Sequence, residues 1–254
     1  MSKELRKEVD KVISTICKAI GFKKKQYYFV KLLDDNVTAT LSFGMTSYKA
    51  KGHIFVDVIV GVSHKNLEQL YADLTDIDKS IFKPTIGEQI GYMMPQNTYI
   101  EWEFIENSDN THVFEDLFKS IQTYGFIYQE KMKDFDNLFE AFDKRESGVL
   151  NYGRDRYLPI LYYLKGNKEQ GLKIIEEAIE RMSKRPTDEE IRNGKKPEDV
   201  IILRAGESPK MTGDEMEKAL KKLRPGGETI IVGGGVGEVD PSYLEFVERY
   251  KALK

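Results

Sequence analysis

Residues 53–60 read HIFVDVIV, and this stretch decides which kind of fold the chain can form. As a β-strand it would place four aliphatic side chains on one side: Ile54, Val56, Val58 and Val60. The other side would carry a mixed set: His53, Phe55, Asp57 and Ile59. Alternation of this kind is typical of an antiparallel sheet with one face in the core and the other in water.

Further strand patterns flank this stretch. Residues 37–43, VTATLSF, also alternate, and a turn at 34–36 joins them to an apolar run at 27–33. Residues 98–105 alternate again after a loop rich in glycine and proline. The sequence therefore predicts an antiparallel sheet of about four strands.

Two helices accompany the predicted sheet. Apolar residues recur at three- and four-residue spacing over residues 3–20, and Gly21 follows as a natural helix end. A shorter helix is expected to begin near Ser63. We therefore expect an α+β fold for residues 1–108, with helices on one face of the sheet.

The pattern after residue 109 is helical. Apolar spacing predicts helices over about 113–121 and 132–142, separated at Gly125, and a helical hairpin over 155–183. The hairpin resembles a single tetratricopeptide-like unit, carried by Tyr162, Gly171, Ile175 and Ala178. No second copy follows at that period, so an ordinary hairpin is expected.

The end of the chain has a βαβ-like pattern. A strand at 200–203, a helix at 212–223 and a strand at 229–232 precede a last helix that starts at Asp240-Pro241. We expect one domain over residues 1–108 and a mainly helical region with this short tail over 109–254.

Composition excludes several function classes. The 254 residues include 39 Lys and Arg against 42 Asp and Glu, a net charge of −3, which argues against a nucleic-acid partner. Cys17 is the single cysteine, so no intramolecular disulfide can form. Residues 1–6 alternate in charge where a signal peptide would have an apolar core, and no apolar run of membrane length occurs, so neither a signal peptide nor a membrane span is expected. We expect a cytoplasmic protein that does not bind membranes.

The segment ETIIVGGGVGEVDP at 228–241 raises the question of a phosphate site. A strand, a glycine-rich turn and a helix start follow in the order that lets backbone N–H groups bind an anion, with four candidate residues: Gly233, Gly234, Gly235 and Gly237. The spacing departs from the dinucleotide fingerprint, and Asp240 would itself cap the helix. A flexible connection is favoured over a cofactor site, and no cofactor is expected.

The polar face of the predicted sheet is the second candidate site. It would gather Thr38, Thr40, Ser42, His53, Asp57, Glu101 and Glu103. Two carboxylates at i and i+2 on a strand stand about 7 Å apart, which is close enough for acid and base roles. Plain solvation, a partner-binding surface built on His53, Asp57, Glu101 and Glu103, and catalysis all remain open.

No other motif in the sequence predicts a reaction. The acids of 73–78 lack the glycine and the distal Glu of a calcium loop, and the three histidines are not spaced for zinc. Cys17 lies in a helical apolar stripe and is predicted to be a buried side chain rather than a reactive thiol. We expect no metal site and no catalytic residues.

One resemblance adds to this picture. The sequence AIGFKK at 19–24, which closes a helix and leads into an antiparallel meander, resembles an uncharacterised group of bacterial domains of unknown function. Some relatives in that group are discussed with toxin-immunity proteins. The resemblance covers about the first 110 residues. It implies a fold and a bacterial context, and no catalytic residues.

Three hypotheses follow. The first is a non-enzymatic binding protein, of immunity type or an accessory factor, that acts on a protein partner. The alternative is a small enzyme or sensor that holds a nucleotide or phosphate ligand at residues 233–237. The third is a scaffold that forms a homodimer through the aromatic helices between residues 113 and 142.

Overall fold

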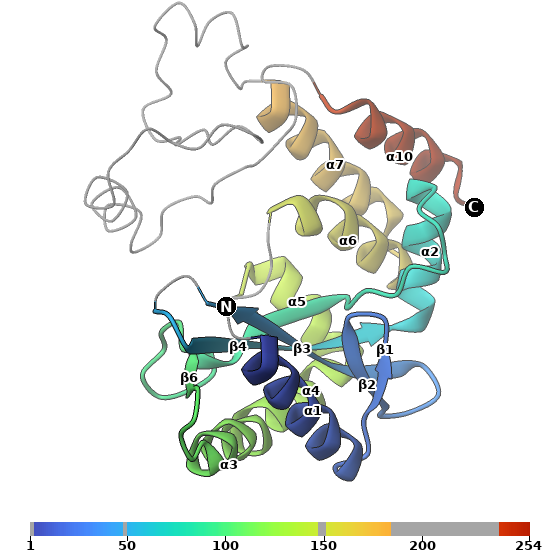
Figure 1. The fold of residues 1–254 in the computed structure, drawn as a ribbon. Helices are drawn as coiled ribbons and strands as arrows, with labels where there is room; N and C mark the ends of the chain where they lie inside the picture. The colour runs from blue at the N-terminus through green and yellow to red at the C-terminus, as the bar shows by residue number, and fades with distance from the viewer. Residues whose placement is uncertain (1–2, 48–49, 147–150, 184–238) are drawn as a thin grey trace, which may run out of the picture. The chain divides into compact units, whose positions relative to one another are not determined.

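The computed structural model describes residues 3–47, 50–146, 151–183 and 239–254 (Figure 1). The chain divides into two compact units, Met1–Val149 and Leu150–Lys254. This division lies after the boundary near residue 108 that the change of hydrophobic period suggested. The reason is that the helices following residue 109 pack on the sheet and belong to the first unit.

The first unit contains one antiparallel sheet. Its strands are β1 Lys23–Lys25, β2 Tyr28–Leu32, β3 Val37–Thr46, β4 His53–His64, β5 Ile86–Gln89 and β6 Trp102–Ile105. The central strand is β4, which pairs with β3 along one edge and with β5 and β6 along the other. The α+β class with its antiparallel sheet is therefore confirmed.

Two strands were not predicted, and one is shorter than predicted. The sequence of β1 is KKK, and that of β5 is IGEQ, so neither carries an apolar alternation. In the 98–105 stretch only β6 joins the sheet. The backbone before it is used elsewhere, because Thr98 N donates to Gly91 O and Ile100 O accepts from Gln89 Nε2.

The core lies on the aliphatic face of β4, which we call the inner face. Helix α1 Lys3–Ala19 buries Leu5, Val9, Ile13 and Cys17 against it. Helix α3 Thr111–Ser120 adds Leu117 and Phe118 to the same cluster. In Figure 1, α1, α3 and α4 lie together on one side of the strands. Helix α1 ends as predicted, with Gly21 at φ +90°.

The helices after residue 109 are more continuous than predicted. Helix α3 runs through a π-helical turn, Ile121–Gly125, into α4 Phe126–Lys133, and the break comes at Asp134 before α5 Phe135–Lys144. Gly125 is a packing residue, because a Cβ there would lie 3.1 Å from Val60 Cγ2. Two aromatic residues of the helices proposed for a homodimer, Phe118 and Phe142, are buried within this unit.

Helix α2 Lys65–Thr75 follows β4 directly, as predicted from the sequence. It buries Leu67, Tyr71 and Leu74. Its first N–H groups are capped by Asn36, whose backbone oxygen accepts from Lys65 N and whose side-chain oxygen accepts from Asn66 N. Asp76 ends the helix in a left-handed conformation.

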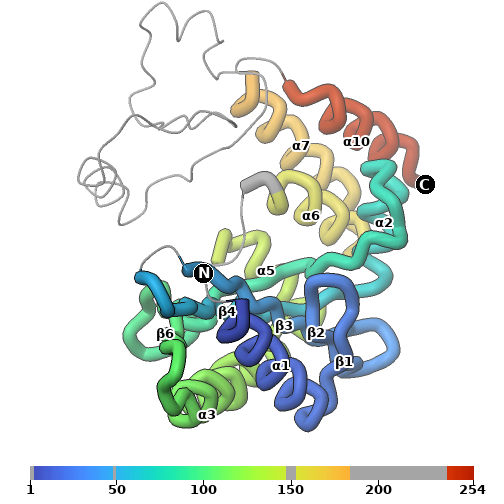
Figure 2. The backbone as a smooth tube through the Cα atoms, viewed as in Figure 1, coloured from blue at the N-terminus to red at the C-terminus, as the bar shows by residue number. Residues whose placement is uncertain are grey.

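The second unit is a helical hairpin with a third helix. Helices α6 Asn151–Leu164 and α7 Lys168–Ser183 form the predicted hairpin, and α10 Pro241–Ala252 begins at the predicted residue (Figure 2). The predicted strands, the helix at 212–223 and the glycine loop lie outside the described residues.

Helix α10 binds the hairpin through two tyrosine hydroxyls. Pro159 lies inside α6 and has no N–H to donate to the carbonyl of Asp155 four residues earlier. Tyr243 Oη donates to that carbonyl at 3.1 Å, and Tyr250 Oη donates to Pro159 O at 2.9 Å. Gly171 makes room for Tyr250, since a Cβ there would lie 1.9 Å from the hydroxyl oxygen. Both tyrosines therefore satisfy backbone oxygens of α6.

Candidate functional site

The strand register brings the four predicted partner-binding residues to one side of the sheet. His53 and Asp57 lie on the face of β4 opposite the core, which we call the outer face. In the pairing of β4 with β6, Phe55 stands opposite Glu103, and continuing that register sets Asp57 opposite Glu101. We call His53, Asp57, Glu101 and Glu103 the acidic face.

His53 and Glu103 form one pair within the acidic face. Their side chains meet at 2.8 Å between Nδ1 and Oε1, and both are partly exposed. The His53 ring also stacks on Phe55, with ring centroids 6.5 Å apart. Ion pairs between side chains that are this exposed to solvent contribute little to the stability of a fold. The contact orients the imidazole on the surface of the sheet.

Asp57 is the carboxylate of the acidic face whose pKa is shifted. Burial is the largest cause that raises its pKa, its own backbone N–H acts in the opposite direction, and the neighbouring charge of Glu101 raises it further. Among the described residues Asp57 forms no ion pair. The folded chain therefore holds a half-buried carboxylate beside a second one.

Gly44 lies beside Asp57 of the acidic face, although the sequence pattern did not single it out. It stands opposite Asp57 in the pairing of β3 with β4. A Cβ at residue 44 would lie 2.0 Å from Asp57 Oδ1, so the carboxylate rests where any other residue would place its side chain. A glycine inside a strand is the signal that could have found this close approach.

The other end of the outer face differs from the prediction. Thr38, Thr40 and Ser42 do share the face of His53 and Asp57, as the register shows. Thr40 and Ser63 are buried, however, so that end is not an open solvated surface. Helix α2 and the segment 77–83 flank it and form a cavity with Thr38 and Ser63.

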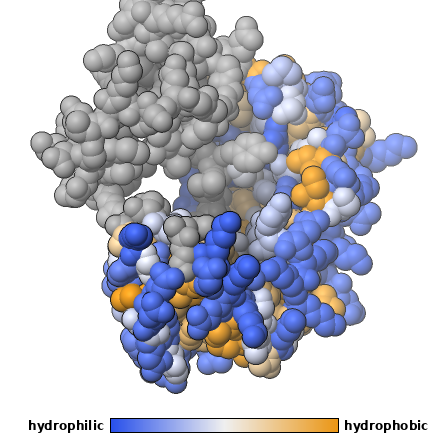
Figure 3. Space-filling model, in the orientation of Figure 1, coloured by the Kyte–Doolittle hydropathy of each residue, from blue (hydrophilic) through white to orange (hydrophobic). Residues whose placement is uncertain are grey.

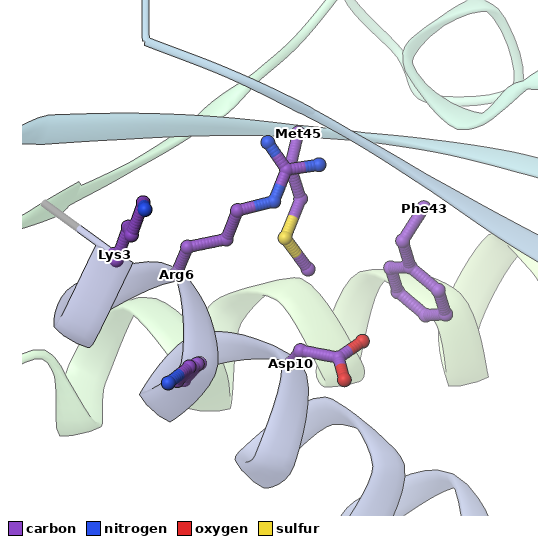
Figure 4. A pocket seen from close by; sticks show the side chains of 6 residues that line it. Lys3, Arg6, Asp10, Phe43 and Met45 are labelled. Atoms are coloured by element: carbon purple, nitrogen blue, oxygen red, sulfur yellow. The ribbon is translucent and has the colours of Figure 1, made fainter. Parts of the chain in front are cut away.

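A basic hollow lies on the opposite side of the sheet. It has a volume of about 360 Å³ and is lined by Lys3, Arg6, Lys7, Asp10, Phe43 and Met45. Figure 4 shows the side chains of Arg6 and Asp10 rising from α1 toward Met45 and Phe43 on β3. The carboxylate of Asp10 shares the hollow and lies 3.6 Å from Lys24 Nζ. This acid offsets part of the positive charge.

A smaller hollow of about 300 Å³ surrounds Tyr128. The phenolic oxygen is buried and has no hydrogen-bond partner among the described residues. Its pKa is raised by burial first and then by the charges of Glu88 and Glu146. The group is therefore a neutral phenol at physiological pH, and it can donate a proton only as a hydrogen bond.

Two side chains of reactive types, Cys17 and His64, are buried in the core. Cys17 is buried as predicted, and burial raises the pKa of its thiol to about 12. His64 is also buried, and its Nε2 lies 2.8 Å from Met132 O. Burial lowers the pKa of His64, and it outweighs the hydrogen bond to Met132 O and the charges of Asp34 and Asp134, which raise that pKa. The thiol is thus not a nucleophile at neutral pH.

The glycine-loop prediction cannot be placed, because Gly233, Gly234, Gly235 and Gly237 lie outside the described residues. One part of that reasoning is confirmed. Asp240 caps the last helix, with Oδ1 accepting from Ser242 N at 2.9 Å. The side chain of Asp240 thus occupies an N–H group that an anion would need.

Within the described ranges, no three His, Cys, Asp or Glu residues are grouped to hold a metal ion. No helix there is both long enough and apolar enough to cross a bilayer. In the view of Figure 3, hydrophilic residues dominate the described surface and hydrophobic residues form small patches. Comparisons with protein-family models, with curated proteins and with solved structures find no match for this chain.

Proposed function

We propose that this protein acts by binding a protein partner, as an immunity-type or accessory factor, and that the acidic face is the contact surface. The observation that carries the proposal is the state of Asp57. Its carboxylate is half-buried beside Glu101, its pKa is raised, and no described residue neutralises it. A cationic side chain of a partner would relieve that electrostatic cost.

The surroundings of the carboxylates fit a protein surface better than a free ion. Exposed apolar side chains lie on or beside the same side of the sheet: Tyr99 is 47% exposed, Ile59 is 41% exposed and Ile105 is 38% exposed. Apolar contacts surrounding a charged pair exclude water and strengthen that pair. The expected partner surface therefore presents Lys or Arg side chains among apolar residues.

Arginine matches the geometry best. A guanidinium group can donate to two carboxylates at once. Glu101 directly precedes β6, and the continued register of β4 and β6 sets it opposite Asp57. Directly opposite residues of an antiparallel pair have Cβ atoms about 5 Å apart. One planar group can bridge that spacing.

The test is a quantitative pull-down from the native cell with the full chain as bait. Asp57→Asn combined with Glu101→Gln removes both charges and keeps the side-chain shapes. The matched control is Glu115→Gln with Glu130→Gln, which removes two exposed acids from α3 and α4. The first variant is expected to lose a protein that the wild type and the control both retain, and added salt should weaken that capture. Identical partner lists for all three baits would refute the acidic face as the contact surface.

A further inference from the structure

A second site lies at the far end of the outer face, away from the acidic face. A cavity of about 590 Å³ opens between the sheet, helix α2 and the segment 77–83, and we call it the outer cleft. Its floor is one row of paired residues on three strands, Leu32, Thr38 and Ser63. The volume lies within the range of pockets that hold small molecules.

The roof of the outer cleft, segment 77–83, is held by contacts to Gln26 and to helix α2. The Gln26 side chain binds the backbone of the roof twice, donating to Ser80 O at 3.0 Å and accepting from Phe82 N at 3.2 Å. Directly after Phe82, the ammonium group of Lys83 lies over the ring of Tyr71 and 3.7 Å from Glu68 Oε2 on helix α2. Two independent anchors of this kind preform a site, which reduces the entropic cost of binding a ligand.

The charges around the outer cleft favour an anion. Four lysines line it, Lys25, Lys65, Lys79 and Lys83, together with three acids, Asp35, Glu68 and Asp78. Two of the acids are already neutralised or hydrogen-bonded. Glu68 accepts from the Thr85 hydroxyl at 2.7 Å and pairs with Lys83, and Asp78 accepts from Ser80 N at 2.8 Å, which lowers its pKa.

Two of the four cations have no carboxylate within ion-pair distance among the described residues. Lys25 lies with its ammonium 4.3 Å above the ring of Phe82, and Lys65 begins α2. Lys79 and Lys83, in contrast, pair with Asp73 and Glu68. The two unpaired lysines share the cleft with two ionised acids, Asp35 and Asp78. Over the whole lining, four lysines against three acids give a formal charge of +1.

Apolar side chains are exposed in the same cleft. Leu32 is 75% exposed on the floor and Ile81 is 56% exposed in the roof. Lys25 pairs with Tyr28 at one end of β2, and Leu32 stands four residues further along the strand. Four residues of a strand span about 13 Å. The cleft is therefore long enough for an apolar body with a charged group at one end.

We propose that the outer cleft binds a small amphipathic organic anion, with its apolar body on Leu32, Ile81 and Phe82. The anionic group is bound by Lys65 or by Lys25, which lie toward opposite ends of the cleft. This site is separate from the acidic face, so the two proposals stand or fall independently.

The probe is 8-anilinonaphthalene-1-sulfonate, an aromatic anion whose fluorescence rises in an apolar site. Its neutral counterpart without the sulfonate, N-phenyl-1-naphthylamine, is titrated in parallel. The folded full chain is expected to bind the sulfonate saturably and the neutral dye about tenfold more weakly, because a charge-assisted contact is lost. Equal affinity for both dyes would overturn the assignment of an anion.

Variants locate the site. Lys65→Ala or Lys25→Ala is expected to weaken sulfonate binding about tenfold and to leave the neutral dye unchanged. Lys24→Ala is the matched control, because Lys24 neighbours Lys25 but lies over Phe29 on the inner face.

Ala72→Phe, which narrows the cleft, should weaken the binding of both dyes. If neither lysine variant changes the sulfonate titration, or if Ala72→Phe leaves it intact, the dye binds elsewhere and the proposal is wrong. Unchanged circular dichroism and thermal unfolding confirm that each variant is folded.

Discussion

The carboxylate of Asp57 rests directly on Gly44 of the neighbouring strand, where a Cβ would stand 2.0 Å from Oδ1. The two residues are paired across β3 and β4 and lie on the face opposite the core. Gly44 has no side chain to displace the carboxylate, so Asp57 can lie flat on the sheet near Glu101. The acidic face therefore depends on a residue that carries no charge.

Gly44→Ala tests this contact, and its effect is expected to change sign with the residue at position 57. In the wild-type chain the new Cβ forces the carboxylate out of place, which should lower the free energy of unfolding by about 1 kcal/mol. In an Asp57→Ala background the same change should be neutral or stabilise by up to about 1 kcal/mol, because alanine loses less backbone entropy on folding. Urea unfolding followed by Trp102, the single tryptophan, measures all four proteins. An equal effect in both backgrounds would contradict the contact.

Asp57→Asn is expected to stabilise the folded chain at neutral pH. The folded pKa of Asp57 is raised, so the folded state holds this proton more tightly than the unfolded state. Stability is therefore lost as the pH rises from the usual value of 3.8 through the raised folded pKa, and asparagine removes that loss. The midpoint temperatures of thermal unfolding of the two proteins should be equal near about pH 3 and should differ increasingly toward about pH 7. A wild type more stable than the variant at neutral pH would mean that the folded chain itself neutralises Asp57.

Tyr243→Phe is expected to destabilise the second unit, because the Asp155 carbonyl loses its hydrogen-bond donor. An unpaired buried carbonyl costs about 1–3 kcal/mol. In a Pro159→Ala background the new N–H can donate to Asp155 O, so the cost of Tyr243→Phe should fall below about 1 kcal/mol. Denaturant unfolding followed by circular dichroism gives the four free energies. Additive effects of the two substitutions would show that the tyrosine and the proline are not coupled.

Much of the architecture was predictable because it is local. The alternation of residues 53–60 placed His53 and Asp57 on one face of a strand before any pairing was known. The cap residues Gly21 and Asp240 likewise predicted a helix end and a helix start, since both act within one turn of the chain. These signals depend on backbone conformation and side-chain chemistry within a few residues.

Other features were missed because no local signal distinguishes them. Gly125 predicts a helix break, yet the helix continues through this residue. The backbone of Gly125 lies against the side chain of Val60, where a Cβ would be crowded. The short strands β1 and β5 have no apolar alternation, and they form because neighbouring strands offer unpaired backbone groups. The outer cleft was also missed, because its floor, wall and roof come from segments between residues 25 and 83.

The sequence by itself determined the class of fold and which residues share a face, because periods of two and of about three and a half residues are properties of the backbone. It also determined where several helices begin and end. Only the tertiary structure decided that Asp57 lies on Gly44 and that Tyr250 fits against Gly171. Those contacts join residues on different elements, and their distances follow from strand register and helix packing, which many side chains set together.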